Sequence, residues 1–232
     1  MVEGSLLGDY VSEADSASAK YVLVGGFAGW IGDNITFSNA DNPSWTGSFV
    51  NTGTIKFTGS TKGLVQIGGI AGRATSKLPV IVNGGKFVNK GDIVCTGSFN
   101  TAVTGSNCVG GIIGYTNQVI ENAEVHCNIN AQSAQFGMIT GAVRSDAVIA
   151  KNCKVGGNYL ENVTGEDTDG NTTTTLTEFP LDESNWMNYI YGGVTTWPAE
   201  TDYDGCSFLP SKDDIVIPPV VEEPAPEPTP EA

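Results

Sequence analysis

The sequence is poor in basic residues, in histidine and in long apolar runs. It has 11 Lys and Arg residues against 26 Asp and Glu. So few cations cannot neutralise a phosphate backbone or an anionic membrane surface, so we expect no nucleic-acid partner and no docking on acidic lipids. The single histidine, His126, excludes mechanisms that need two. No run of about 18 apolar residues occurs, so we expect no membrane insertion by this chain.

Two further absences concern export and cysteine chemistry. The first ten residues have neither the basic nor the apolar region of a signal peptide, so we expect a cytosolic protein or a piece of a longer one with further domains. The five cysteines are odd in number and irregularly spaced, which fits neither a disulfide framework nor a zinc site. We expect them to be buried, reduced thiols, and we predict no metal and no cofactor.

The acidity is confined to one part of the chain. Residues 1–156 carry 10 acidic and 10 basic residues, whereas residues 157–232 carry 16 acidic residues and one basic residue, Lys212. The charge therefore divides the chain into a neutral region and an acidic one, and says little about what the neutral region binds.

The neutral region contains a repeated glycine hexad. Three copies read VGGFAG, IGGIAG and VGGIIG, and a degraded fourth reads FGMITG; they occupy Val24–Gly29, Ile67–Gly72, Val109–Gly114 and Phe136–Gly141. Their start-to-start spacings are 43, 42 and 27 residues. A regular motif at such spacing indicates a repeat protein, and the paired glycines permit a tight corner or a close backbone approach.

A second motif alternates with the hexad. Phe49–Ser60 and Phe87–Ser98 agree at eight of twelve positions, and weaker copies begin at Glu121 and Lys151. We predict that equivalent residues stack in columns, one of asparagines, one of phenylalanines and one of mixed apolar residues: Asn51, Asn89, Asn122 and Asn152; Phe49 and Phe87; Phe57, Cys95 and Cys127. Asparagine suits such a column because it tolerates the left-handed turn conformation and its amide can bond along the stack.

These segments are short, rich in Val, Ile and Phe, and bounded by Gly, Asn, Thr and Ser, which is typical of strands and turns. The repeat lengths vary while the motifs stay intact, as stacked coils allow because extra residues loop out sideways. We predict an all-β fold: a right-handed parallel β-solenoid (β-helix) over residues 20–156. An antiparallel β-sandwich is the alternative.

The hexads and the strands that alternate with them resemble the GLUG-type glycine-rich repeats of secreted and cell-surface proteins of Bacteroidetes-type bacteria. The resemblance covers roughly residues 22–156, and the chain departs from it where Gly-Gly replaces a Gly-Leu pair and where Met138 replaces a glycine. It implies a non-catalytic module, located outside the cell or on its surface, that stands beside other domains of a longer protein.

Outside the repeats we predict three further regions. Residues 1–19 form a lead-in, residues 157–214 a capping region, and residues 215–232 a disordered Pro/Glu-rich linker or tail. The cap should contain a β-hairpin of 158–164 and 171–178 around an Asp-Gly turn, since an unpaired last strand would invite association. Asp167–Glu178 also carries EF-hand ligand types at positions 1, 3, 5 and 12, but Thr172 stands where that loop needs glycine. We favour a plain hairpin over a calcium site.

Two functions remain open from the residues. The first is an adhesin or stalk that binds a glycan or a host surface protein, with ligand-binding aromatic residues at Trp30, Trp45, Trp186, Tyr191 and Trp197. The second is a carbohydrate-active β-helix enzyme, a polysaccharide lyase or hydrolase, in which Asp92 and Glu124 would stack near Thr54 as a carboxylate pair. A basic partner for such a pair is nearly absent, so we predict no catalytic residues; a purely mechanical spacer is a third alternative.

Overall fold

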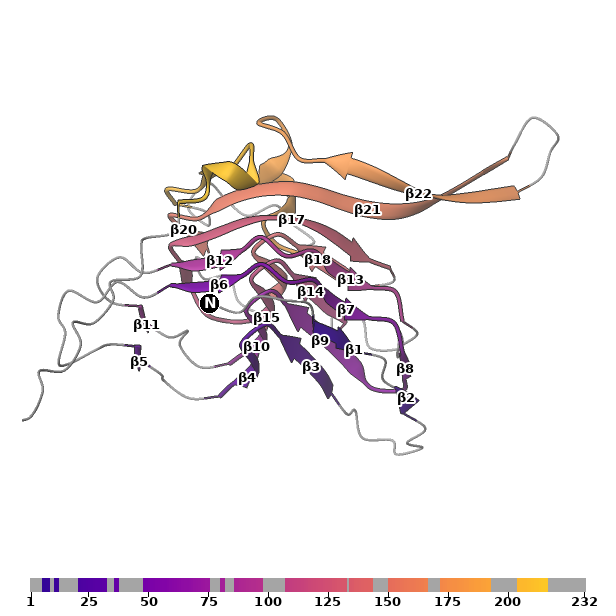
Figure 1. The fold of residues 1–232 in the computed structure, drawn as a ribbon, viewed down its shortest axis with the longest axis horizontal. Coiled ribbons are helices and arrows are strands. Elements are labelled where there is room, and N and C mark those ends of the chain that lie inside the picture. The colour runs from indigo at the N-terminus through magenta and orange to yellow at the C-terminus, as the bar shows by residue number, and fades with distance from the viewer. Residues whose placement is uncertain are drawn as a thin grey trace, which may run out of the picture.

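The computed structural model describes residues 6–8, 11–12, 21–32, 36–37, 48–75, 80–81, 86–97, 107–132, 134–143, 150–166, 172–192 and 204–216. In these residues the regular structure is almost entirely β, and the strands of one repeat lie beside those of the next (Figure 1). Pairing between repeats is parallel, which confirms an all-β fold of parallel sheets and excludes the antiparallel sandwich. Over the same residues, no helix is long and apolar enough to cross a bilayer.

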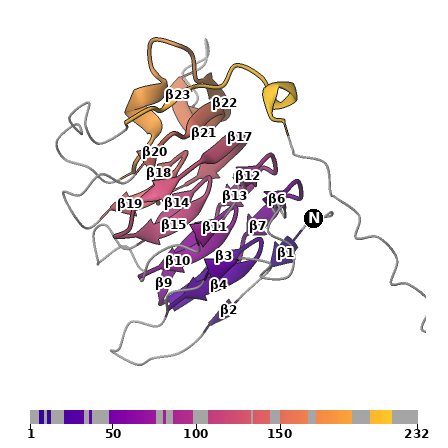
Figure 2. The ribbon, with the colours of Figure 1, turned by 90° about the vertical axis from the view of Figure 1, so that its left-hand side faces the viewer.

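The hexads build two four-stranded sheets, because each hexad ends one strand and begins the next. Sheet 2 contains β3 (Tyr21–Gly25), β9 (Leu64–Gly68), β14 (Cys108–Gly110) and β18 (Gln135–Gly137). Sheet 3 contains β4 (Ala28–Ile31), β10 (Ala71–Ala74), β15 (Ile113–Thr116) and β19 (Thr140–Val143). Within each sheet the strands follow chain order, so every repeat adds one strand to each (Figure 2).

The alternating motif builds the nine-stranded sheet 1. Its strands are β1 (Leu6–Gly8), β6 (Phe49–Asn51), β7 (Ile55–Phe57), β12 (Phe87–Asn89), β13 (Ile93–Cys95), β17 (Ala123–Ala131), β21 (Lys154–Glu166), β22 (Thr172–Pro180) and β23 (Ser207–Phe208). Three two-stranded pairs complete the description: β2 (Val11–Ser12) with β8 (Ser60–Thr61), β5 (Thr36–Phe37) with β11 (Val80–Ile81), and β16 (Ile120–Glu121) with β20 (Ala150–Lys151).

The core lies between these sheets and is filled by branched aliphatic side chains. Ile67, Val109 and Ile112 are fully buried, and Ile93 and Ile129 lie opposite them in sheet 1. The predicted phenylalanine column is present, since the rings of Phe49 and Phe87 stack with centroids 5.7 Å apart.

The glycines of the hexad corners are required by space rather than by backbone conformation. Gly25, Gly68, Gly110 and Gly137 are in register in sheet 2, and a Cβ on any of them would overlap the carbonyl oxygen three residues later. None of the four has a positive φ. The sequence left a tight corner and a close approach as alternatives, and the structure decides for the close approach.

The asparagine column was predicted in the wrong register. Asn51 pairs with Asn89, but Asn89 pairs with Val125, so Asn122 lies three residues too early to join them. Asn122 and Asn152 instead occupy corners that precede β17 and β21, with φ of 56° and 51°. The two properties expected of asparagine therefore belong to different residues. Asn51 and Asn89 bond along the stack, whereas Asn122 and Asn152 adopt the left-handed conformation.

In sheet 1, the third and fourth repeats each have one continuous strand where the first two repeats have two short strands joined by a turn. The turn between β12 and β13 is absent from β17, which runs on for nine residues. Cys95 therefore pairs with Ala131, which corrects the predicted column of Phe57, Cys95 and Cys127. Cys127 is nonetheless fully buried, in the part of β17 that replaces the turn.

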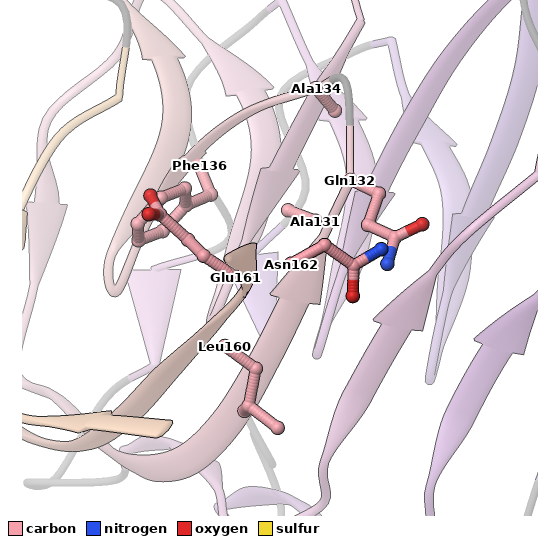
Figure 3. Close-up of a pocket in the computed structure, with 7 residues that line it drawn as sticks. All are labelled: Ala131, Gln132, Ala134, Phe136, Leu160, Glu161 and Asn162. Carbon is pink, nitrogen blue, oxygen red and sulfur yellow. The ribbon is translucent and has the colours of Figure 1, made fainter. Parts of the chain in front are cut away.

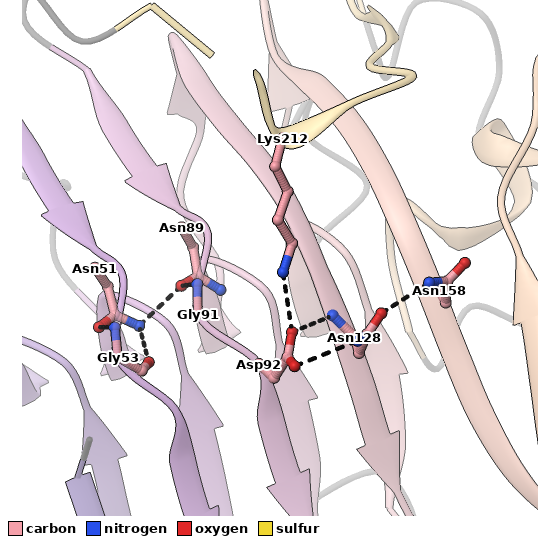
Figure 4. Close-up of polar contacts among 8 residues, drawn as sticks. All are labelled: Asn51, Gly53, Asn89, Gly91, Asp92, Asn128, Asn158 and Lys212. Carbon is pink, nitrogen blue, oxygen red and sulfur yellow. Dashed lines mark hydrogen bonds and ion pairs between the residues drawn. The ribbon is translucent and has the colours of Figure 1, made fainter. Parts of the chain in front are cut away.

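A polar ladder crosses sheet 1 (Figure 4). The Asn51 amide donates to Asn89 Oδ1 at 2.8 Å, and the backbone N–H of Gly91 donates to the same oxygen at 3.1 Å. In the next column Asp92 accepts from the Asn128 backbone at 2.9 Å, and the Asn158 amide donates to Asn128 Oδ1 at 2.8 Å. Each amide thus connects one repeat to the next.

The predicted hairpin is present and longer than expected. β21 and β22 pair antiparallel from Asn158–Pro180 to Glu166–Thr172, and the far end of the pair extends away from the sheets (Figure 1). The boundary placed after residue 156 falls inside β21, whose first half pairs with β17. The capping region therefore begins on the same strand that ends the repeats. A 3₁₀ turn, η1 (Trp186–Tyr189), follows the hairpin.

Residues 204–216, the C-terminal strap, return across sheet 1. β23 pairs with β21 in parallel, and Leu209 and Ile215 pack on Val50 and Val88. The strap also contains η3 (Lys212–Asp214), from which Lys212 reaches Asp92 at 3.3 Å. The predicted lead-in is described only at β1 and β2. Of the predicted Pro/Glu tail over residues 215–232, only Ile215 and Val216 are described, and Ile215 is buried.

Candidate functional site

Four side chains form an aromatic strip on sheets 2 and 3: Tyr21 and Trp30, which are exposed, and Arg73 and Tyr115, which are half-buried. Trp30, Arg73 and Tyr115 are in register on β4, β10 and β15, and Tyr21 lies on β3 of the adjoining sheet. The residue that directly follows each of the three on its strand is buried: Ile31, Ala74 and Thr116. The strand alternation therefore turns these larger side chains outward.

The strip presents ring faces and one guanidinium. Trp30 is 61 % exposed and Tyr21 is 46 % exposed, and the Trp30 indole N–H donates to Thr75 Oγ1 at 3.1 Å. The Arg73 guanidinium lies 4.8 Å from the Tyr21 ring centre and 5.0 Å from that of Tyr115. Among the described residues Arg73 has no carboxylate partner, and its Nε has no hydrogen-bond acceptor. The two rings hold the half-buried cation in place by cation–π contacts.

A pocket lies where the hairpin leaves the sheets (Figure 3). This hairpin pocket has a volume of about 380 Å³ and is lined by Ala131, Gln132, Ala134, Phe136, Leu160, Glu161 and Asn162. The Phe136 ring stacks on the rings of Tyr159 and Tyr189, with centroids 5.3 and 6.0 Å apart. These two rings hold Phe136 in position. The pocket combines one aromatic wall with planar polar side chains.

The residues predicted to bind a ligand are separated in the structure. Trp30 belongs to the aromatic strip. Trp186 and Tyr191 belong to the core, with 8 % and 6 % of their surface exposed, and the Tyr191 hydroxyl accepts from the Ala150 backbone at 2.9 Å. Neither ring offers a face to a ligand. Trp45 and Trp197 lie outside the described residues.

The prediction missed Tyr21, Arg73 and Tyr115. The spacing of the hexads could have found two of them, because Arg73 and Tyr115 each follow the last glycine of a hexad directly, as Trp30 does. Tyr21 follows no such rule, because it reaches the strip from the other sheet.

The candidate carboxylate pair is not brought together. Asp92 is in register with Asn128, and Glu124 with Val88 and Lys154. Glu124 is buried and accepts from Lys86 Nζ at 2.6 Å, with Lys154 Nζ at 3.4 Å. Asp92 is held by Asn128 and Lys212. The two acids therefore each serve a local ion pair, and the predicted pairing was wrong by four residues.

The hairpin geometry does not suit a calcium loop. Glu178 pairs with Leu160 on β22, six residues along an extended strand from Thr172. Six residues of strand span about 20 Å, so Glu178 cannot close a 12-residue loop around an ion at the turn. Residues 167–171 lie outside the described part, and within it no cluster of His, Cys, Asp and Glu could hold a metal.

His126 faces outward on β17 while Cys127 points into the core, so they do not form a nucleophilic pair. Its ring Nε2 lies 3.3 Å from the Pro210 carbonyl oxygen, to which it donates when neutral. Nδ1 is buried without a partner. Desolvation has the largest effect and lowers the pKa of His126 below its ordinary value. The hydrogen bond to the Pro210 carbonyl raises this pKa, the Lys212 charge lowers it and Asp214 raises it, in decreasing order of effect.

We expect the folded protein to lose stability as the pH falls through the ordinary histidine pKa of about 6.5. The unfolded chain binds the His126 proton more readily than the folded chain, so acid favours unfolding there. Urea unfolding at pH 7.5 and 5.5 checks this. In the variant His126→Gln the urea midpoint should change less between these two pH values. An equal change of midpoint in variant and parent would contradict the assignment to His126.

The fold and the strip together define an all-β repeat protein of parallel sheets with an outward row of aromatic side chains. When compared with known proteins, the chain matches no family model, and no curated protein or solved structure is significantly similar to it. The resemblance to GLUG-type repeats stays a prediction that rests on the hexads.

Proposed function

We propose that this chain is a non-catalytic repeat module of a bacterial surface or secreted protein, and that its aromatic strip binds carbohydrate. The observation that carries the proposal is the alignment of Trp30, Arg73 and Tyr115 across three repeats. Neighbouring parallel strands lie about 4.8 Å apart, so the three side chains form a continuous platform along which a chain of sugars can lie.

The chemistry of the strip suits a sugar with an acidic substituent. Ring faces pack against the C–H faces of pyranose rings, and the Arg73 guanidinium supplies donors in a fork that matches a carboxylate. We therefore favour a polysaccharide that contains uronic acid over a neutral one. The exposure of the Trp30 and Tyr21 side chains fits adhesion better than turnover.

The proposed architecture is a right-handed parallel β-solenoid, in which each repeat forms one coil. The shared strand order of sheets 1, 2 and 3 supports it, as does the strong preference of parallel crossovers for the right hand. Such a coil stack would make the module a stalk as well as a binding surface. The proposed location is outside the cell, in agreement with the implied family.

We expect Trp30→Ala to weaken binding to a uronate polysaccharide such as polygalacturonate at least tenfold. Packing about 100 Å² of ring against a sugar is worth roughly 2.5 kcal/mol, and tenfold corresponds to about 1.4 kcal/mol. Affinity electrophoresis and calorimetry measure the change. Because Trp30 is exposed, thermal unfolding of the variant should match the parent.

The hairpin pocket provides the matched control. Glu161→Ala changes an exposed residue of that pocket and should leave the affinity within twofold. If Glu161→Ala weakens binding and Trp30→Ala does not, the strip assignment is overturned. Release of reducing ends or unsaturated products from the polysaccharide would favour the enzyme instead, and no binding on a broad glycan array would favour a mechanical spacer.

A further inference from the structure

Cys153 and Cys206 are neighbours across a parallel strand pair. β21 and β23 pair with Lys154 opposite Ser207, and the Ser207 N–H donates to the Cys153 carbonyl at 2.9 Å. The Asn152 N–H donates to the Asp204 carbonyl at 2.8 Å, so the register continues on the other side of the two cysteines. Residues facing each other on parallel strands are about 4.8 Å apart, inside the Cα range of about 4.4–6.8 Å that disulfides span.

The two side chains also lie on the same face of the strand pair, because residues in register on parallel strands point the same way. The neighbouring Cys206 thiol and burial raise the pKa of Cys153, and the interaction with Cys153 lowers the pKa of Cys206. Cys153 is fully buried, whereas Cys206 is half-buried in the strap. The pair therefore has one accessible sulfur of thiolate character and one protected sulfur behind it.

The other three cysteines differ from this pair. Cys95, Cys108 and Cys127 are all fully buried. Burial raises the pKa of Cys95 and of Cys127 to about 12, and raises that of Cys108 as well. They are expected to stay reduced as small apolar core residues.

We propose that Cys153 and Cys206 form a disulfide bond under oxidising conditions, which fastens the C-terminal strap to the last repeat. The pairing was not foreseen in the sequence, where five cysteines at irregular spacing indicated free thiols. The inference does not depend on carbohydrate binding, since it concerns only the attachment of residues 204–216.

The oxidant is a low-molecular-weight disulfide such as oxidised glutathione. The Cys206 thiolate attacks one of its sulfurs, forms a mixed disulfide and displaces one glutathione thiolate. Cys153 then gives up its proton and attacks Cys206 sulfur, which breaks the mixed disulfide and releases the second glutathione thiolate. Two electrons pass from the protein to the glutathione pair, and the two thiol protons end on the two released thiols.

The bond would strengthen a weakly attached segment. The strap is held by the two-residue strand β23 and its flanking backbone hydrogen bonds, by apolar contacts such as those of Leu209 and Ile215, and by polar contacts with His126, Lys90 and Asp92. The Lys212–Asp92 ion pair is largely exposed and worth little by itself. A covalent link would keep the strap on sheet 1 in the surroundings of a secreted protein.

The test is intact-mass and peptide mass spectrometry of the full chain after incubation with oxidised glutathione, followed by alkylation in denaturant. We expect a loss of 2 Da by two-thiol oxidation and three alkylated cysteines. Trypsin should release residues 152–154 from residues 155–212 only after reduction. The oxidised protein should unfold at a temperature about 5–10 °C higher than the reduced one.

Cys206→Ser, a conservative change at a half-buried site, should leave four alkylated cysteines and remove the difference between oxidised and reduced protein. Cys95→Ala is the matched control and should keep the 153–206 link. Five alkylated cysteines in the oxidised, folded parent, or a link that involves Cys95, Cys108 or Cys127, would overturn the proposal. Loss of glycan binding with the link intact would count against the proposed function alone.

Discussion

Gly68→Ala is expected to lower the free energy of unfolding by about 3 kcal/mol or more, because one methyl group has no space at the hexad corner. An alanine Cβ there would overlap the Ala71 carbonyl oxygen and lie 2.7 Å from Gly114 N and Ile112 O. These are backbone atoms of the same corner and of the next repeat. They cannot rotate away, so the parallel strands would have to separate.

Urea unfolding followed by circular dichroism measures the effect. Gly165→Ala is the matched control, since its Cβ would meet no atom within 4 Å. We expect that variant to stay within about 0.5 kcal/mol of the parent, as surface substitutions usually do. Equal stability of the two variants would show that the hexad glycines are not required by close packing.

Asn89→Ala is expected to destabilise the fold by about 2–3 kcal/mol. Asn89 is fully buried, and its Oδ1 accepts from the Gly91 N–H and from the Asn51 amide. Without it the Gly91 N–H is left buried and unpaired, and the Asn51 amide keeps only its bond to the Gly53 carbonyl, at about 1–3 kcal/mol for each buried group left without its partner. The variant Asn51→Ala should show coupling with Asn89→Ala in a double-mutant cycle, because the two amides share one bond.

The comparison is with Asn158→Ala, which removes an amide bond of the same 2.8 Å length at a half-buried site. Water can replace that bond, so we expect a loss below about 1 kcal/mol. If Asn89→Ala and Asn158→Ala have equal effects on the urea midpoint, burial does not govern the strength of the ladder.

The hexads could be predicted in full register because three glycines mark each of the first three copies and two mark the fourth. Val24, Ile67, Val109 and Phe136 pair in that order, as the sequence alignment of the copies requires. The degraded fourth copy keeps the same register. The N–H of Met138, which stands where the other copies have glycine, donates to the Tyr189 carbonyl at 2.6 Å.

The alternating motif was aligned wrongly where it lost its glycine. Asn122 looks equivalent to Asn89 by residue type, yet Val125 takes that place and is fully buried. A buried valine can replace a buried asparagine once β17 runs straight and no turn N–H needs an acceptor. Residue type alone cannot reveal such an exchange, because it follows from the path of the backbone.

The candidate sites show the same division. Trp30 was predicted as a ligand-binding residue. Arg73 and Tyr115 occupy the equivalent position in the next two repeats, and they were missed because their residue types differ from tryptophan. Trp186 and Tyr191 look alike in sequence to Trp30, but they fill the end of the core beside Ile190. Whether an aromatic ring is exposed depends on whether it lies on the solvent side of a sheet or on the side that faces the core.

By itself the sequence determined the repeat, the strand-rich fold and the confinement of the net charge to the C-terminal third. These follow from local spacing and composition, which act within one repeat. Only the tertiary structure decided which asparagines bond to each other, that Asp92 and Glu124 stand apart, and that Cys206 lies against Cys153. Those relations join residues 32 to 53 positions apart, and their geometry is fixed by the register of parallel strands rather than by any local preference of the chain.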